Sequence, residues 1–146
     1  MSARVFVDAN VLVYAHDADA GAKHDVAMEA LAEIWAERCG VLSTQVLEEF
    51  YSAVTRKISR RLRHGDALEA LRAYAAWDVQ VISVATVLEA ARLAERHRLA
   101  LWDGLIVAAA VEAGAETILT EDFQDGARIA GVAVRSPFGG RQQRGR

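Results

Sequence analysis

The 146 residues carry a formal net charge of −3, and 53% of them are hydrophobic and 25% charged, which is typical of one globular domain. No run of about 18 apolar residues occurs, so we expect no membrane span, and the N-terminus does not match a secretion signal. The single Cys39 excludes an internal disulfide and favours a reducing cytoplasm, while the mildly acidic balance does not by itself indicate a nucleic-acid-binding protein.

The first half of the chain predicts one strand and two long helices. Residues 4–8 are apolar up to Asp8 and form a short buried strand, after which a helix can begin near Asn10. Apolar residues at helical spacing predict a helix over 22–38. A glycine break and a short apolar stub follow, and a second long helix is expected over 45–63.

The second half predicts alternating helices and strands. Helices are expected over 66–76 and 87–96, with a strand over 79–84 between them, and further strands at 116–123 and 131–136. The segment "WDGLIVAAAVEAG" is apolar on all sides, which indicates a buried helix that begins near Asp103. Alternation of this kind predicts the α/β class, as a three-layer α/β/α sandwich with a central, mainly parallel sheet. We expect one domain over 1–137 and a flexible Arg/Gly-rich tail over 138–146.

Four acidic residues lie at or near the ends of these elements. Asp8 and Asp122 follow strands, Asp103 opens the buried helix, and Glu49 lies on the second turn of its helix. Each has a structural explanation, as a helix cap, a turn residue or a solvated acid. Acids gathered at one edge of a parallel sheet would repel one another unless a cation neutralised them. Oxygen ligands without Cys or His pairs suit Mg²⁺ or Mn²⁺, so a divalent-metal site is the alternative explanation.

The segments around these acids resemble a known family. "VFVDANVLVYA", "LSTQVLEEFY", "LWDGLIVAAA" and "TILTEDF" resemble the four acidic motifs of PIN-domain ribonucleases, and their order and spacing most closely resemble VapC toxins. The resemblance implies that the catalytic, metal-binding acids are Asp8, Glu49, Asp103 and Asp122. It also separates Glu49 from Glu48, which helical geometry does not.

Three polar residues acquire supporting roles through the same resemblance. Asn10 is the polar residue associated with the first motif, and Thr120 is the hydroxyl partner of the fourth. Asp125 is an additional, outer residue of the site. The resemblance further implies an Mg²⁺- or Mn²⁺-dependent ribonuclease that acts as a toxin, forms a homodimer and is silenced by a VapB-like antitoxin partner.

Basic residues gather in a segment that contains no acid. Residues 50–65 contain Arg56, Lys57, Arg60, Arg61 and Arg63, and the tail adds Arg141, Arg144 and Arg146. On a helix over 45–63, Arg56 and Arg60 would lie seven and eleven positions after Glu49 on one face. We therefore predict that these two arginines bind phosphates of RNA that enters the acidic site, with a solvated basic face as the alternative. The tail arginines either add RNA contacts or belong to a flexible end.

Two other functions compete with a ribonuclease. An aspartyl-phosphate phosphatase would need a second Asp where Asn10 stands, and a Lys later in the chain than Lys57. A non-catalytic RNA-binding module with a PIN fold would be expected to have lost acids, whereas all four are present. No Ser or Cys nucleophile motif and no P-loop occurs, so metal-assisted attack by water is the simplest chemistry. The RNA target, the cleavage sequence and the number of metal ions stay open.

Overall fold

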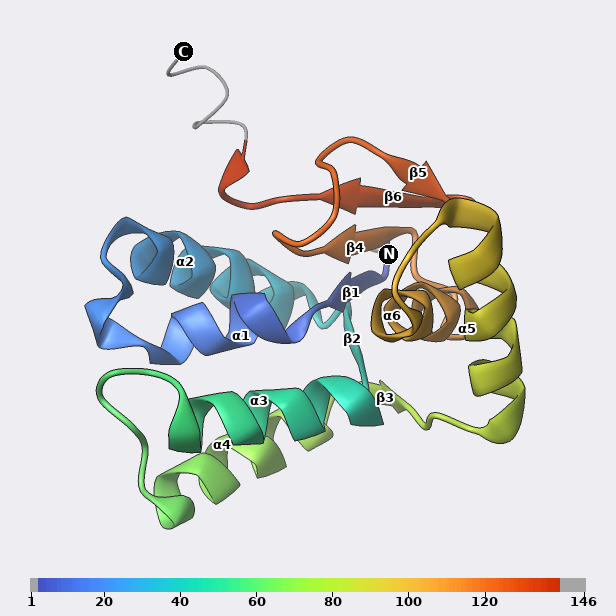
Figure 1. The fold of residues 1–146 in the computed structure, drawn as a ribbon. Helices are drawn as coiled ribbons and strands as arrows, with labels where there is room; N and C mark the ends of the chain where they lie inside the picture. Colours follow the sequence, from blue (N-terminus) through green and yellow to red (C-terminus); the bar gives the residue numbers. More distant parts are fainter. Residues whose placement is uncertain (1–2, 140–146) are drawn as a thin grey trace.

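A six-stranded sheet forms the middle layer of the computed structural model, which describes residues 3–139 (Figure 1). The strands lie in the order β3-β2-β1-β4-β6-β5, and only the β5–β6 pair is antiparallel. Their bounds are β1 Val5–Val7, β2 Gly40–Ser43, β3 Asp78–Gln80, β4 Thr117–Leu119, β5 Arg128–Ile129 and β6 Val132–Arg135. The predicted α/β class with a mainly parallel sheet is confirmed.

Helices cover both faces of this sheet (Figure 1). Their bounds are α1 Ala9–His16, α2 Ala22–Glu37, α3 Thr44–Arg56, α4 His64–Ala75, α5 Val84–His97 and α6 Leu101–Glu112, with a 3₁₀ turn at Ala18–Ala20. Helix α6 lies across one face, and α5 packs on its outer side. Helices α1 and α3 leave the carboxyl ends of β1 and β2, so both begin at the edge where a parallel sheet binds its ligands. No helix of residues 3–139 is long and apolar enough to cross a membrane.

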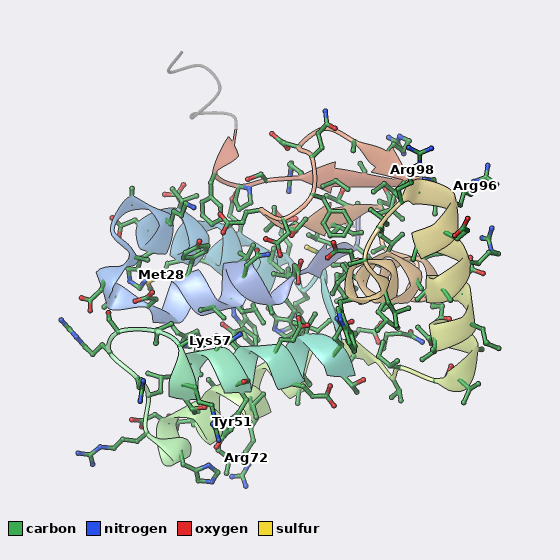
Figure 2. All side chains as sticks on the ribbon, viewed as in Figure 1. Met28, Tyr51, Lys57, Arg72, Arg96 and Arg98 are labelled. Carbon is green, nitrogen blue, oxygen red and sulfur yellow. The ribbon has the colours of Figure 1, made fainter. Side chains whose placement is uncertain are left out.

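The predicted helix over 45–63 is too long. Helix α3 ends at Arg56, because the backbone amides of Lys57 and Ile58 both donate to the carbonyl of Ala53 and turn the chain. This turn brings the Ile58 side chain into the core, where it is 8% exposed. Arg60 therefore does not lie on the helical face of Glu49, and that part of the argument for its role is wrong. Figure 2 shows Lys57 at this turn.

Other boundaries also differ from the prediction. The strand over 79–84 ends at Gln80, because Ser83 and Thr86 form a capping box that starts α5. Helix α6 begins at Leu101, so Asp103 lies within its first turn and is not its cap. Strand β5 was not expected; it is a two-residue strand joined to β6 by a turn with two positive φ angles.

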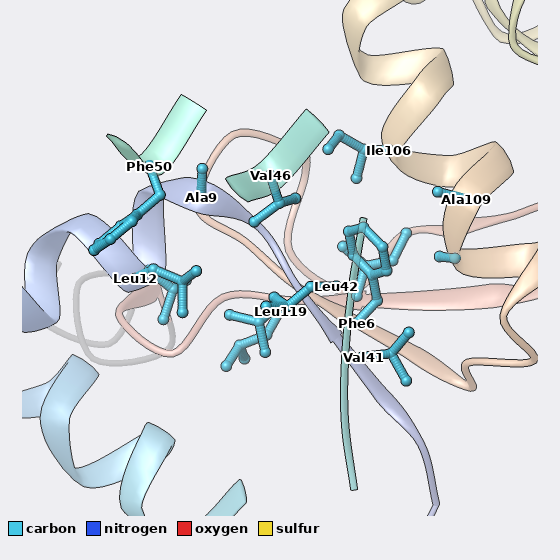
Figure 3. Close-up of a cluster of buried hydrophobic side chains, with 14 of the residues drawn as sticks. Phe6, Ala9, Leu12, Val41, Leu42, Val46, Phe50, Ile106, Ala109 and Leu119 are labelled. Atoms are coloured by element: carbon cyan, nitrogen blue, oxygen red, sulfur yellow. The ribbon is translucent and has the colours of Figure 1, made fainter. Parts of the chain in front are cut away.

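The hydrophobic core lies between the sheet and the helices on each side (Figure 3). Phe6 of β1 is fully buried and faces the Ile106 and Ala109 side of α6 (Figure 3). Leu12 and Phe50 are fully buried where α1 and α3 meet. The all-apolar helix is buried as predicted, from Gly104 to Ala110. This packing fixes the backbone at the carboxyl edge of the sheet, where polar side chains follow the strands. The tail residues Arg141, Arg144 and Arg146 lie outside the described residues, and the domain boundary at 137 stays a prediction.

Candidate active site

Asp8 is a buried carboxylate at the end of β1. Its side chain caps α1, since Oδ1 accepts a hydrogen bond of 2.7 Å from the backbone amide of Ala9. Its other oxygen, Oδ2, accepts from the hydroxyl of Thr120 at 2.8 Å and from the amide of Asn10 at 3.4 Å. The residue is 5% exposed. The cap explanation is therefore correct, and the same carboxylate also faces the end of the neighbouring strand β4.

Asn10 and Thr120 join the first and last acidic segments. The Asn10 amide nitrogen donates to the Thr120 hydroxyl oxygen at 3.2 Å, and the Asn10 carbonyl oxygen accepts from the backbone amide of Glu121 at 3.3 Å. The hydroxyl oxygen of Thr120 also accepts from the backbone amide of Asp122 at 3.1 Å. The two predicted supporting residues thus lie in contact with Asp8, and they fix the backbone that carries Asp122.

A second set of contacts holds the segment of Glu121 and Asp122 in place. The Glu121 carboxylate accepts a hydrogen bond from the Tyr14 hydroxyl at 2.6 Å and pairs with Lys23 at 2.8 Å. The Lys23 ammonium also lies 5.0 Å from the Tyr14 ring centre. Sequence reasoning missed these residues. The only signal was the Glu121–Asp122 pair of acids, and nothing local indicates that Tyr14 and Lys23 are its partners.

The Glu49 carboxylate, on α3, is restrained by the buried side-chain amide of Gln45. The Gln45 amide nitrogen donates to the Glu49 carboxylate at 3.2 Å and to the backbone carbonyl of Trp102 at 3.3 Å. Gln45 lies one helical turn before Glu49 and next to the residue that precedes Asp103, so it connects the second and third acidic segments. Its own carbonyl oxygen is buried without a partner among the described residues, which is a costly arrangement. Sequence reasoning missed Gln45 as well.

Each of the four predicted acids lies within electrostatic range of at least two of the others. Burial raises the pKa of Asp8 from 3.8 to about 6, helped by the negative charges of Asp122 and Glu49 and opposed by the hydrogen bonds from Thr120 and Ala9. Burial also raises the pKa of Glu49, to which the charges of Asp122 and Asp103 contribute. The pKa of Asp103 is raised by burial and by Asp122. Asp122 thus acts on all three of the other acids.

This donor set fits a hard divalent cation. It consists of carboxylate oxygens, and neighbouring charges of one sign make ionisation of the acids costly until a cation compensates them. Among residues 3–139, however, no three acidic, His or Cys side chains are arranged closely enough to hold an ion as they stand. Binding would therefore require side chains of the group to move closer together; Glu49 and Asp122 are exposed, whereas Asp8 is held by its hydrogen bonds.

The remaining predicted residues lie away from this group. The Asp125 carboxylate accepts a hydrogen bond of 2.8 Å from the backbone amide of Ser136, so it stabilises the segment after β6. Arg56 is the last residue of α3 and is exposed. Arg60 lies in the loop that follows and pairs with Asp19 at 3.2 Å.

The chain matches the PIN domain family model over residues 5–131. A search of curated proteins finds no match. Solved structures with a similar fold include a toxin–antitoxin complex from Klebsiella pneumoniae, with a TM-score of 0.69 and 21% sequence identity over 92% of this chain and 98% of that one.

Two further solved structures belong to the same group of folds. VapBC2 from Rickettsia felis, bound to a promoter DNA fragment, has a TM-score of 0.62 and 17% identity over 90% of this chain and 97% of that one. VapC20 from Mycobacterium tuberculosis is described as a toxin that cleaves the sarcin–ricin loop. It has a TM-score of 0.59 and 19% identity over 78% of this chain and 86% of that one. At these identities the likeness shows the fold.

Proposed function

The chain belongs to the PIN domain family, and from this we propose that it is a metal-dependent ribonuclease, the toxin of a type II toxin–antitoxin pair. The observation that carries the proposal is the Asp8 carboxyl, which is 5% exposed and has a pKa of about 6 in the field of other acids. Such a perturbed group is typical of a functional site. The sarcin–ricin loop cleaving toxin among the similar folds supports an RNA substrate.

In the proposed site, Asp8, Glu49, Asp103 and Asp122 hold Mg²⁺ or Mn²⁺. When bound, a divalent ion would lower the pKa of a water molecule and neutralise the negative charge that develops on the phosphate. The residues of the chain supply the positioning. The Thr120 hydroxyl and the Ala9 amide fix the orientation of the Asp8 carboxylate, and the Gln45 amide restrains Glu49. Fixed ligands reduce the reorganisation needed when substrate binds.

The experiment is an RNA cleavage assay with Mg²⁺, with Mn²⁺ and with EDTA. We expect cleavage with either ion and none in EDTA, and we expect Asp8→Asn to lower the rate at least about 100-fold, because it removes a charge from the site. Glu95→Gln, which changes an exposed acid on α5, is the matched control and should cleave normally. Metal-dependent RNA binding without cleavage by the wild type would favour the non-catalytic module instead.

The phosphatase alternative loses its support at Asn10. The side chain of this residue is hydrogen-bonded to Asp8, Thr120 and the backbone of Glu121. It ends in an amide, which cannot act as the general acid or base that a phosphatase requires. A phosphorylated Asp8 trapped from a phosphate donor would contradict this conclusion.

We further propose a small VapB-like antitoxin and a second copy of the chain as protein partners. The similar folds include VapBC complexes, which supports the first proposal. The second is supported by α5, where Val84 is 77% exposed and Leu88, one turn later, is 67% exposed. Apolar side chains this exposed on one helical face are typical of an interface. RNA binding by Arg56 and Arg60 stays a prediction, as does an outer role for Asp125.

A further inference from the structure

A groove of about 540 Å³ runs between α1 and α3 and begins at the acidic site. Asn10 and Glu49 line it at one end, and Lys57, Ile58 and Ser59 line it at the other. Helices α1 and α3 run side by side away from the carboxyl edge of the sheet (Figure 1), and the residues that line the groove follow them from Asn10 and Glu49 to Lys57.

Lys57 places a positive charge at the far end of this groove, where Asp17 is the acid that also lines it. Lys57 is exposed, it forms no ion pair with any residue of the described range 3–139, and Figure 2 shows it between α1 and α3. Arg56, its neighbour in sequence, does not line the groove, and Arg60 is paired with Asp19.

The far end of the groove is held in place by side-chain contacts. The Ser59 hydroxyl donates to the Asp19 carboxylate at 2.8 Å, and Arg60 binds the other oxygen of the same carboxylate at 3.2 Å. The Ile58 side chain is buried beneath this loop. These contacts hold the loop that begins at Lys57 against the segment that follows α1, so the backbone position of Lys57 is defined.

We propose that this groove binds the RNA strand on one side of the scissile bond, with the Lys57 ammonium on the phosphate of a neighbouring nucleotide. The inference rests on the proposed ribonuclease function. Glu49 and Lys57 are eight residues apart, about 12 Å along a helix axis, so the lysine contacts a phosphate other than the one at the acids. A cation at this distance offsets the repulsion that the acids exert on an incoming polyanion.

The test measures binding of a fluorescein-labelled single-stranded RNA decamer by anisotropy, in EDTA to prevent cleavage, over a series of NaCl concentrations. Lys57→Met keeps the aliphatic stem and removes the charge; we expect it to weaken binding about three- to tenfold at low salt. It should also reduce the slope of log K against log salt by about 0.7, the value for one lost contact to a single strand. Lys57→Arg should restore both.

Arg63→Met is the matched control, because it removes an exposed charge of the same basic segment that lies outside the groove. It should leave affinity within about twofold and the slope unchanged. Equal losses in the two variants would show diffuse attraction by the basic segment and would overturn the proposal. So would an RNA photocrosslink, made through a reactive uridine, that appears only outside α1 and α3.

The two proposals can fail separately. If the wild type does not cleave RNA with metal but its binding still depends on Lys57, the ribonuclease proposal fails and the groove stands as an RNA site. If the wild type cleaves and Lys57→Met binds RNA normally, the groove proposal fails and the ribonuclease stands. Loss of antitoxin-peptide binding alone in Lys57→Met would assign the groove to a protein partner and would overturn the RNA assignment.

Discussion

Asp8 combines a structural and a chemical role in one carboxylate. One oxygen caps α1 and the other receives hydrogen bonds from two side chains, so each oxygen has a fixed position. An asparagine would also cap the helix. The fold therefore does not need a charged group at 5% exposure. The free-energy cost of burying this carboxylate is explained only by a functional role of its charge.

This cost can be measured with Asp8→Asn in EDTA. Folding raises the pKa of the Asp8 carboxyl from 3.8 to about 6, so the stability that its protonated form contributes is present below about pH 4 and is lost as the pH rises through about 6. The variant has no such charge. We expect it to exceed the wild type in free energy of unfolding by up to about 3 kcal/mol above pH 7, with little difference at pH 4.

Urea unfolding at several pH values measures this difference. Glu95→Gln, an exposed change, should stay within about 0.5 kcal/mol of the wild type throughout. A difference between Asp8→Asn and the wild type that does not vary with pH would show that the buried charge is not its source.

From recognisable motifs, sequence reasoning selected residues that the structure brings into contact. Asp8, Asn10 and Thr120 lie in contact as a set, although Asp8 and Thr120 are 112 residues apart. It missed Gln45 and Glu121, because their importance comes from contacts with partners on other elements. Local patterns indicate which residues can carry charge, but not which amide or hydroxyl will hold it in place.

At the scale of elements, the position of Asp103 depends on how closely α5 and α6 approach. They cross at Gly104, where an added Cβ would lie 2.5 Å from the backbone carbonyl oxygen of Ala90. Backbone cannot yield as a side chain does, so the glycine sets the distance between the two helices. The residue before it is Asp103, so the contact also places an acid of the candidate site.

Gly104→Ala should therefore lower both stability and activity. We expect a loss of about 1–3 kcal/mol in the free energy of unfolding, because the helices must separate, and a reduced cleavage rate, because Asp103 moves with α6. Gly65→Ala on α4 is the control, since a Cβ there meets nothing within 4 Å. It should be neutral or stabilising by about 0.5–1 kcal/mol. Equal effects of the two changes in thermal or urea unfolding would contradict this account.

The elements themselves were largely predictable, but their ends were not. The all-apolar segment gave a buried helix as expected, whereas α3 was predicted to continue through Arg60. Helical spacing does continue to that point in the sequence. The helix stops earlier because the chain turns at Lys57 and Ile58, and the turn is stabilised by burial of the Ile58 side chain in the core, which is a tertiary effect.

At the scale of the whole molecule, residues 3–139 leave the apolar face of α5 uncovered. Val84 and Leu88 are exposed on one side of the helix, whereas Ala90 and Leu93 are buried. The proposed homodimer would bury that face. Leu88→Arg should then convert a dimer into a monomer, because a charge would be desolvated at the interface.

Light scattering coupled to size-exclusion chromatography gives the molar mass directly. Met28→Arg is the matched control; Met28 is 52% exposed on α2, away from α5 (Figure 2). It should leave the mass unchanged. A wild type that elutes as a monomer at high concentration, or a Leu88→Arg variant that remains dimeric, would remove α5 as the interface.

The pairing of β1 with β4 has a consequence for how the protein is made. Strand β1 is synthesised well before β4, its partner in the sheet, and Asp8 meets Thr120, 112 residues later in the chain, only when the two strands pair. A nascent chain that stops before β4 contains Asp8, Glu49 and Asp103 but lacks the strand that Thr120 follows. A site that depends on the Asp8–Thr120 contact therefore forms only after β4 has been synthesised and has paired with β1.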